Sequence, residues 1–346
     1  MDLTWTSKTL ELDRPLSISR ATMANRVAVW VSLTAGGQTG QGEVVGSPRL
    51  GLDRATIGTA LDGIAARIAR CTGHEQVRAL LPRLRSEFPL PVVAALDSAV
   101  HDALARRAGL PLAEYLGLPP WVSVPTAYTI GLGDPAEAEA AARRMTGAGF
   151  TVLKVKAGAP DPAADIARVR AVRAAAPDTE LLLDPNGAWD VGTAVAVLDA
   201  LAGERIAAVE QPVAAGAPEQ LAEVARRVPI PVLADEDAGS IADLDRLPAG
   251  IGGINIKLAE CGGIDAARTM LGWARARGLP VMLGCQVASS LGIAPAVQLA
   301  GAARWVDLDG HLLLARDPWT GLGGADGVLR RPAGPGLGVR RVRAIA

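Results

Sequence analysis

The sequence predicts an α/β protein: a (β/α)7β barrel, a modified TIM barrel, preceded by an α+β capping domain. Three observations predict this fold. Eight short apolar runs recur from residue 123 onward, Ala- and Arg-rich segments with helical spacing separate them, and successive runs begin about 22 to 30 residues apart. Alternating helices and continuously apolar strands are typical of a parallel sheet covered by helices, and eight such strands predict closure into a barrel.

The strands expected in the barrel share an apolar body and, in most cases, a polar end. They are VPTAYTI (124–130), TVLKVK (151–156), ELLLD (180–184), IAAVE (206–210), PVLAD (231–235), GINIK (253–257), PVMLG (280–284) and WVDLD (305–309). The segment after the eighth run is too rich in Gly and Pro for a helix, so we expect seven strand–helix units and a final strand. A doubly wound open sheet is the alternative, but no GxGxxG follows the first strand, and GLGGADG near 321 lacks the strand–helix context.

The segment before the barrel has a different pattern. Residues 27–33 and 41–45 predict antiparallel strands joined by a turn over 34–40, and the apolar spacing in 53–118 predicts helices. We therefore expect a capping domain over 1–120, the barrel over 121–317, and a tail over 318–346 that returns to the capping domain.

Composition excludes several functional classes. The formal net charge is −1, so nothing indicates binding to nucleic acid or to an anionic membrane surface. Cys71, Cys261 and Cys285 are scattered without a CxxC pair, which is typical of a reducing compartment. The N-terminus carries charges early and has no apolar signal region, so we expect a cytoplasmic protein.

One apolar segment is long enough to span a membrane. Residues 278–303 contain no Asp, Glu, Lys or Arg. They also contain two prolines and several Gln and Ser residues, and they match the barrel repeat. We therefore interpret the segment as part of the barrel.

Three carboxylates end three successive strands of the predicted barrel. Asp184, Glu210 and Asp235 are each about 25 residues apart, one strand–helix unit, which places them on adjacent strands at one height. Their mutual repulsion requires a cation between them, and oxygen ligands favour Mg²⁺ over Zn²⁺. The alternative is that each acid caps the next helix, which explains Asp184 alone.

Lysines end the strands on either side of this carboxylate trio. Lys154 and Lys156 end the second strand and, being two residues apart, face the same side; Lys257 ends the sixth strand. Beside a metal and other cations we expect a lowered lysine pKa, which suits a general base. The alternative is that they are solvated surface lysines.

Two more acids, Asp307 and Asp309, end the eighth strand across the barrel from the trio. With no third partner they are suited to a cationic group of a substrate, such as an ammonium; a salt bridge to a nearby Arg is the alternative. His311 follows them and is expected to reach the pocket. Glu236 follows Asp235 and is expected to pair with Lys257 or to support the metal ligands.

Other reactive side chains are expected to be structural. His74 and His101 fall in the N-terminal helices, and Cys285 lacks a His–Asp partner set. Asn186 and Trp189, which follow Asp184, are expected to shape the rim of the site.

The motifs together resemble the muconate-lactonizing-enzyme subgroup of the enolase superfamily, over essentially the whole chain. The matching pieces are KVK (154–156), DPNGAW (184–189), VEQP (209–212), ADED (234–237) and NIKLAECGG (255–263). The resemblance implies one Mg²⁺ per subunit on Asp184, Glu210 and Asp235. The metal would hold a substrate carboxylate and stabilise the enediolate formed from it.

The resemblance also implies roles for the lysines. Lys156 and Lys257 are acid/base catalysts on opposite faces of the substrate Cα, and Lys154 neutralises the carboxylate. With one catalyst on each face, the configuration inverts.

Within the subgroup, DLDG (307–310) is similar to the DxD motif of dipeptide epimerases. There the aspartates, here Asp307 and Asp309, hold the free ammonium of a dipeptide. Arg20 resembles an arginine that contacts a distal carboxylate, and Thr129 occupies a substrate-contacting position. We therefore expect a small-molecule dipeptide substrate, no nucleic acid or membrane partner, and a homo-oligomer.

Two departures from the family pattern bear on specificity. His311 stands where such enzymes often have proline, and QVASS (286–290) lacks an acid often found there. The alternatives are an N-acylamino acid racemase, a lactonizing or dehydrating relative, or a non-catalytic binding barrel.

Overall fold

The computed structural model describes residues 1–342 and begins with a three-stranded antiparallel sheet. Its strands are β1 (Asp2–Ile18), β2 (Ala21–Ala35) and β3 (Gln38–Val45), paired in that order. The helices α1 (Arg54–Ile68), α2 (His74–Glu87), α3 (Leu90–Ala108) and α4 (Leu112–Tyr115) follow, with the 3-10 turn η1 (Pro48–Leu50) before them. The strands expected at 27–33 and 41–45 lie within β2 and β3.

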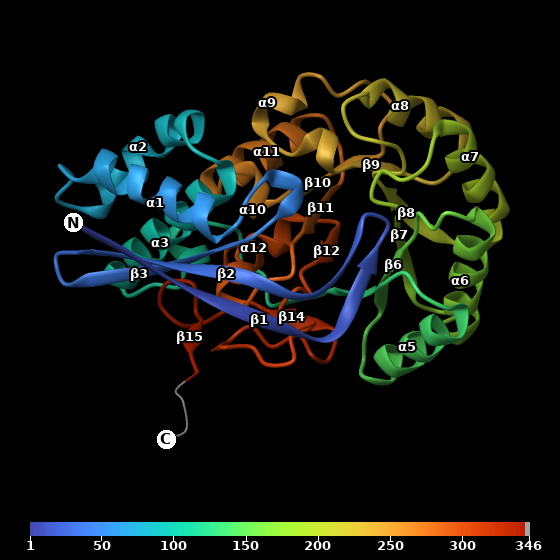
Figure 1. The fold of residues 1–346 in the computed structure, drawn as a ribbon, viewed down its shortest axis with the longest axis horizontal. Helices are drawn as coiled ribbons and strands as arrows, with labels where there is room; N and C mark the ends of the chain where they lie inside the picture. Colours follow the sequence, from blue (N-terminus) through green and yellow to red (C-terminus); the bar gives the residue numbers. More distant parts are fainter. Residues whose placement is uncertain (343–346) are drawn as a thin grey trace.

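A sheet of eight parallel strands forms the second part (Figure 1). Its strands, in spatial as in chain order, are β5 (Ala127–Ile130), β6 (Val152–Lys156), β7 (Glu180–Asp184), β8 (Ile206–Glu210), β9 (Val232–Ala234), β10 (Gly253–Lys257), β11 (Val281–Gly284) and β12 (Trp305–Asp307). β12 also contacts β5, so the sheet curves into a nearly closed barrel. The eight predicted strands and the barrel are confirmed, and the doubly wound alternative is wrong.

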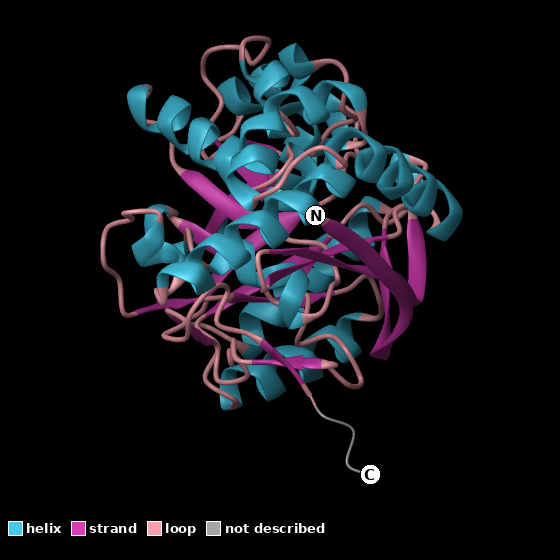
Figure 2. Ribbon diagram, turned by 90° about the vertical axis from the view of Figure 1, so that its left-hand side faces the viewer, coloured by secondary structure: helices cyan, strands magenta, loops and turns pink. Residues whose placement is uncertain are grey.

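Helices cover the outside of the barrel (Figures 1 and 2). They are α5 (Pro135–Gly147), α6 (Pro162–Ala175), α7 (Val191–Ala200), α8 (Pro218–Arg227), α9 (Ile241–Leu244), α10 (Leu258–Cys261), α11 (Ile264–Ala276) and α12 (Ser290–Val297), with 3-10 turns η2 (Ala202–Glu204), η3 (Glu236–Ala238) and η4 (Ala300–Ala302). Three of the helices begin after an aspartate, Asp134, Asp161 or Asp190, whose carboxylate accepts a hydrogen bond from the first turn.

The apolar segment 278–303 forms β11 and α12 of the barrel. α12 is eight residues long and lies almost entirely buried. Within residues 1–342, no helix combines the length and the apolarity needed to cross a bilayer.

The chain after the eighth strand returns across the molecule. β14 (Val328–Arg330) pairs with β4 (Ser123–Pro125), and β13 (Trp319–Thr320) pairs with β15 (Arg340–Arg341). The backbone N–H of the buried Leu337 donates to Asp102 of α3 at 2.8 Å. The tail thus contacts the helices of the N-terminal part.

The hairpin of β1 and β2 extends from the N-terminal sheet to one end of the barrel (Figure 1). The backbone N–H of Leu132, just after β5, donates to Ser17 O at 2.8 Å. A Cβ on Gly158, just after β6, would lie 2.8 Å from Ser19 Cβ. The hairpin tip therefore packs on the loops that follow the barrel strands, where barrel active sites lie.

Candidate active site

Strand alternation places polar side chains above an apolar plug in the barrel interior. Val152, Leu182, Ala208, Leu233 and Trp305 belong to one buried cluster from five different strands. The residues two positions further along are Lys154, Asp184, Glu210, Asp235 and Asp307, and all five are at most 4% exposed. Because alternate residues of a strand face the same side, the plug and the charged layer above it are consecutive layers of one interior.

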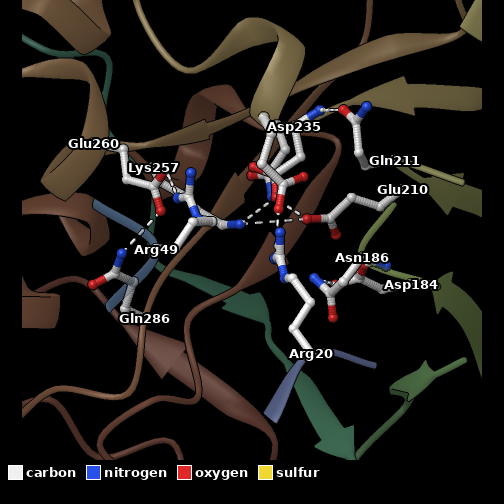
Figure 3. A network of polar contacts seen from close by, with 12 residues as sticks. Arg20, Arg49, Asp184, Asn186, Glu210, Gln211, Asp235, Lys257, Glu260 and Gln286 are labelled. Atoms are coloured by element: carbon white, nitrogen blue, oxygen red, sulfur yellow. Dashed lines mark hydrogen bonds and ion pairs between the residues drawn. The ribbon is translucent and has the colours of Figure 1, made fainter. Parts of the chain in front are cut away.

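The three carboxylates predicted as metal ligands are buried and held by neighbouring amides. Asn186 donates from its backbone N–H to Asp184 at 2.9 Å, and Asn255 Nδ2 donates to Glu210 Oε1 at 2.7 Å. Gln211 Oε1 accepts from the backbone N–H of Asp235 at 3.0 Å, which fixes the chain carrying that acid (Figure 3). Asn255 was missed in the sequence, although a polar residue inside the apolar run GINIK was a usable signal.

The three acids have different electrostatic environments, so their pKa values shift in different directions. Burial raises the pKa of Glu210 to about 7, and repulsion by Asp184 adds to the effect. Burial also raises the pKa of Asp235 to about 6. For Asp184 burial acts the same way, but attraction to Lys156 and Lys154 outweighs it and holds the pKa well below its usual range. The layer therefore holds carboxyl groups that lack sufficient positive charge.

The three predicted lysines lie between these acids. Lys154 Nζ is 2.5 Å from Glu210 Oε2, 3.1 Å from Asp184 Oδ2 and 2.7 Å from Asp307 Oδ2. Lys156 Nζ donates to Asp184 Oδ2 at 2.5 Å. Lys257 Nζ donates to Asp235 Oδ2 at 2.5 Å (Figure 3). The prediction that the lysines flank the trio from strands on either side is confirmed in geometry.

The lowered lysine pKa expected beside a bound metal stays a prediction; in the protein alone, the neighbouring carboxylates govern the pKa of Lys154 and Lys257. Burial alone would lower the pKa of Lys257, but attraction from Asp235 and Glu210 more than offsets it, so the pKa lies well above its ordinary value. The same balance raises the pKa of Lys154. The carboxylates are the nearest charges to both ammonium groups, and the sequence pattern alone does not weigh those distances against the repulsion from other cations.

Asp307, the last residue of β12, and Asp309, two residues later, have separate partners. Asp309 accepts from the backbone N–H of Thr129 at 2.6 Å, and Asp307 contacts Lys154. A protein cation therefore pairs with Asp307, as in the salt-bridge alternative, but it is the lysine of β6 rather than an arginine. Burial raises the pKa of Asp309 to about 7, and repulsion by Asp307 adds to it.

Glu236 and His311 lie differently from the prediction. Glu236 pairs with Arg20 of the hairpin tip, 2.6 Å between Nη2 and Oε1, and no hydrogen bond or ion pair joins it to Lys257 within residues 1–342. His311 is buried, its Nε2 lies 2.8 Å from Gly323 O, and it does not line the cleft described next. Its ring turns toward the tail loop, a direction that sequence spacing does not encode. Trp189 is likewise buried outside the cleft.

A cleft of about 790 Å³ lies between the N-terminal part and the barrel. Its lining includes all three lysines, both aspartates of β12's end, Thr129, Asn186, Arg20 and Glu236. It also includes Gln286 of the QVASS segment, and Arg26, Arg49 and Glu260, which were not predicted as site residues. A space of this size, walled by two parts of the chain and rich in convergent polar groups, suits a small charged ligand.

The residues present fit a hard divalent cation. The donors of the trio are carboxylate oxygens, the ligand type that Mg²⁺ and Ca²⁺ prefer. Glu210 Oε2 is buried and makes no hydrogen bond among the described residues, although Lys154 Nζ lies 2.5 Å away. The raised pKa of Glu210 indicates the same shortage of positive charge.

Comparison with known proteins agrees with this architecture. Residues 1–117 match the model "Mandelate racemase / muconate lactonizing enzyme, N-terminal domain", and residues 136–344 match "Enolase C-terminal domain-like". A hydrophobic dipeptide epimerase from Roseobacter litoralis is 32% identical over 94% of both chains.

Solved structures give the same result. The substrate-liganded L-Ala-D/L-Glu epimerase from Bacillus subtilis superimposes with a TM-score of 0.90 at 28% identity, covering 98% of each chain. A dipeptide epimerase from Methylococcus capsulatus, complexed with Mg and L-Arg-D-Lys, gives 0.88 at 33% identity, again over 98% of each. The chain is an enzyme of the isomerase class, and it belongs to the mandelate racemase/muconate lactonizing enzyme family of the enolase superfamily.

Proposed function

We propose that the chain is a Mg²⁺-dependent dipeptide epimerase that inverts the Cα of the C-terminal residue by transferring a proton between two lysines. One observation carries the proposal: the cleft holds two lysines on opposite sides of a buried carboxylate trio, and a pair of aspartates across from it. The first feature suits a carbon acid next to a carboxylate, and the second suits a free ammonium.

The metal would be held by Asp184, Glu210 and Asp235. When bound there, Mg²⁺ would supply Lewis-acid stabilisation of the negative charge that develops beside a substrate carboxylate. Lys154, 2% exposed and in contact with two of these acids, adds a fixed positive charge beside the same carboxylate.

The proton transfers belong to Lys156 and Lys257. They extend from β6 and β10, with β7, β8 and β9 between them, so a Cα held at the centre has one ammonium on each face. One lysine in its neutral form takes the α-proton, and the other delivers a proton to the opposite face. Both side chains are largely buried, at 11% and 13% exposed, which excludes bulk water from the transfer.

The rest of the dipeptide would be held by the β12 end and the hairpin. Asp307 and Asp309 bind the ammonium of the N-terminal residue, with Thr129 orienting Asp309. Arg20, paired with Glu236 at the rim, contacts a polar group of the C-terminal side chain.

A deuterium-exchange experiment tests the two-base mechanism. The chain with Mg²⁺ in D₂O is expected to epimerise an L,L-dipeptide with uptake of deuterium at Cα of its C-terminal residue. Lys156→Ala and Lys257→Ala should each abolish epimerisation, yet each should still exchange the α-proton of one epimer, and the two should differ in which epimer.

Two outcomes count against the proposal. Full epimerisation by the double variant would exclude both lysines as catalysts. Turnover of N-acylated amino acids but of no dipeptide would favour the racemase alternative, since those substrates carry no free ammonium for Asp307 and Asp309. Lys8→Ala, which alters an exposed lysine of β1, is the matched control and should exchange as the parent does.

A further inference from the structure

The wall of the cleft beside Lys257 carries a charged cluster that the proposed mechanism does not use. We call it the arginine subsite; it consists of Arg26 of β2, Arg49 of η1, Glu260 of α10 and Gln286 after β11. All four residues line the same cleft as the lysines and the β12 aspartates. Figure 3 shows Arg49, Glu260 and Gln286 together beside Lys257.

The acceptor of the arginine subsite is already satisfied. Glu260, 9% exposed, pairs through Oε2 with Arg49 and accepts from Gln286 Nε2 through Oε1 at 2.9 Å. Both carboxylate oxygens therefore have strong donors, and attraction to Lys257 and Arg49 holds the pKa of Glu260 below its usual value against the effect of burial. A substrate cation would have to displace Arg49 to reach this acid.

The guanidinium of Arg26, by contrast, has N–H groups without a hydrogen-bond acceptor among residues 1–342. Arg26 donates once, from Nη1 to Gly46 O at 2.9 Å, and its buried Nε has no hydrogen-bond partner among residues 1–342. Burial lowers the pKa of Arg26, and Glu260, already paired with Arg49, is the only charge that offsets it. A guanidinium stays charged nonetheless, and a buried donor without an acceptor is costly. The cluster carries two arginines against one acid.

Arg49 and Glu260 lie beside Lys257, and Gln286 extends the arginine subsite toward β12. Gln286 follows β11, the hydrogen-bonded neighbour of β12, and Gly284 pairs with Asp307 in register. Arg20 and Glu236 occupy the other rim, after β9. A dipeptide with its ammonium on Asp307 and Asp309 would thus place the side chain of its N-terminal residue beside Gln286.

We propose that Arg26 and Arg49 form an anion subsite that selects dipeptides with an acidic N-terminal side chain. This inference rests on the proposed function, because it assigns one part of the dipeptide to this wall. Arg26 lines the cleft, and its Nη2, which makes no hydrogen bond within residues 1–342, supplies a charged donor for a carboxylate. Glu260 keeps Arg49 in place and disfavours a cationic side chain.

The test compares three dipeptides that differ only in the N-terminal side chain: L-Glu-L-Ala, its neutral isostere L-Gln-L-Ala, and L-Lys-L-Ala. With the parent enzyme, kcat/KM for Cα deuterium exchange should be about tenfold higher for Glu than for Gln, and lowest for Lys. In Arg26→Met the Glu-to-Gln ratio should fall to about one, and Arg26→Lys should keep part of it. Arg143→Met, on the exposed face of α5, is the control and should keep the parent ratio.

Each outcome of this comparison either supports or overturns the proposed arginine subsite. A Glu-to-Gln ratio of one or below in the parent enzyme, or a preference for Lys, overturns the subsite and leaves the epimerase proposal standing. Absence of exchange with every dipeptide overturns both. If Arg26→Met does not fold, as judged by thermal unfolding, the parent ratios and Arg26→Lys still decide.

Discussion

At the scale of single residues, Asp309 is balanced between two charge states. Burial and repulsion by Asp307 raise its pKa to about 7, while Thr129 donates a hydrogen bond that favours the ionised form. A substrate ammonium beside the two acids would stabilise both negative charges. Ligand binding and ionisation are therefore coupled at this residue.

This coupling predicts a pH-dependent Michaelis constant. A carboxyl group with a raised pKa keeps its proton to a higher pH, so below about pH 7 Asp309 is neutral and attracts an ammonium less. We expect KM for a dipeptide to rise as pH falls through about 7, and to be raised about tenfold and to lose that dependence in Asp309→Asn. Steady-state kinetics between about pH 6 and pH 8 measure it. The exposed Asp13→Asn is the control, and an unchanged pH profile in Asp309→Asn would contradict the coupling.

Many of the site residues were predictable because they lie at the ends of apolar strands. Acids and lysines that terminate apolar runs were expected to converge, and the structure brings Asp184, Glu210, Asp235 and the lysines into one layer. The partners of Glu236 and His311 were not predictable, because they depend on where a hairpin tip and a tail loop lie. Arg26 was missed because one charged residue before an apolar run also fits a solvated strand end.

At the scale of elements, the contact between β3 and α3 requires glycine. A Cβ on Gly42 would lie 2.0 Å from the carbonyl oxygen of Ala95, and one on Gly40 would lie 1.8 Å from that of Ala99. Both obstacles are helix backbone, which cannot rotate away. The helix therefore lies directly on the strand, and side chains at these two positions are excluded.

Gly42→Ala should accordingly destabilise the protein. Overpacking of a core typically costs about 1 to 3 kcal/mol, and a clash with helix backbone belongs at the upper end. Gly272→Ala is the control: it lies within α11 with no atom within 4 Å of its Cβ, so it should be neutral or stabilising by about 0.5 to 1 kcal/mol. Urea unfolding of both variants measures the difference, and equal stabilities would refute the packing argument.

Apolar periodicity predicted the elements well in the barrel and less well elsewhere. All eight barrel runs contain a strand, because buried parallel strands are continuously apolar. The connection between β9 and β10 holds only the 3-10 turn η3 and the four-residue α9. β1 runs from Asp2 to Ile18 through a bulge, with many exposed positions. An exposed strand stabilised by pairing leaves a weaker pattern than a buried one.

At the scale of the whole molecule, a buried ionic group joins the N-terminal helices to the barrel. His101 of α3 is fully buried, with Nδ1 3.3 Å from Asp97 and Nε2 3.5 Å from Asp265 of α11. Burial alone would lower the pKa of His101, but the two aspartates raise it to about 9. Arg85 and Arg78 pair with the same two acids from the other side.

The raised pKa predicts a window of pH-dependent stability. A histidine whose pKa is raised on folding stabilises the folded state fully below about pH 6.5, and the contribution is lost as pH rises through about 9. His101→Gln should lower the free energy of unfolding by roughly 3 kcal/mol at pH 6 and by much less above pH 9, since one pKa unit is about 1.4 kcal/mol. Val100→Ala, which alters a buried non-titrating side chain of the same helix, is the control and should lower the free energy of unfolding equally at the two pH values; a parallel offset for His101→Gln would contradict the prediction.

The arrangement of the N-terminal part relative to the barrel was the least predictable feature of the structure. A barrel and a capping segment follow from periodicity, but the path of the β1–β2 hairpin onto the loops after β5 and β6 depends on contacts such as Leu132 with Ser17. Those contacts join residues more than a hundred positions apart, and no local pattern encodes them. The walls of the cleft, and hence its selectivity, belong to this level.

The gathering of lysines in one cleft also allows the site to be observed directly. The chain has four lysines, and only Lys8 lies outside the cleft. A sample grown with isotopically labelled lysine would give four side-chain resonances in a protein of this size, three of them from the cleft. Titration with acid, metal or dipeptide could then be followed on each ammonium separately, without any reporter group being added.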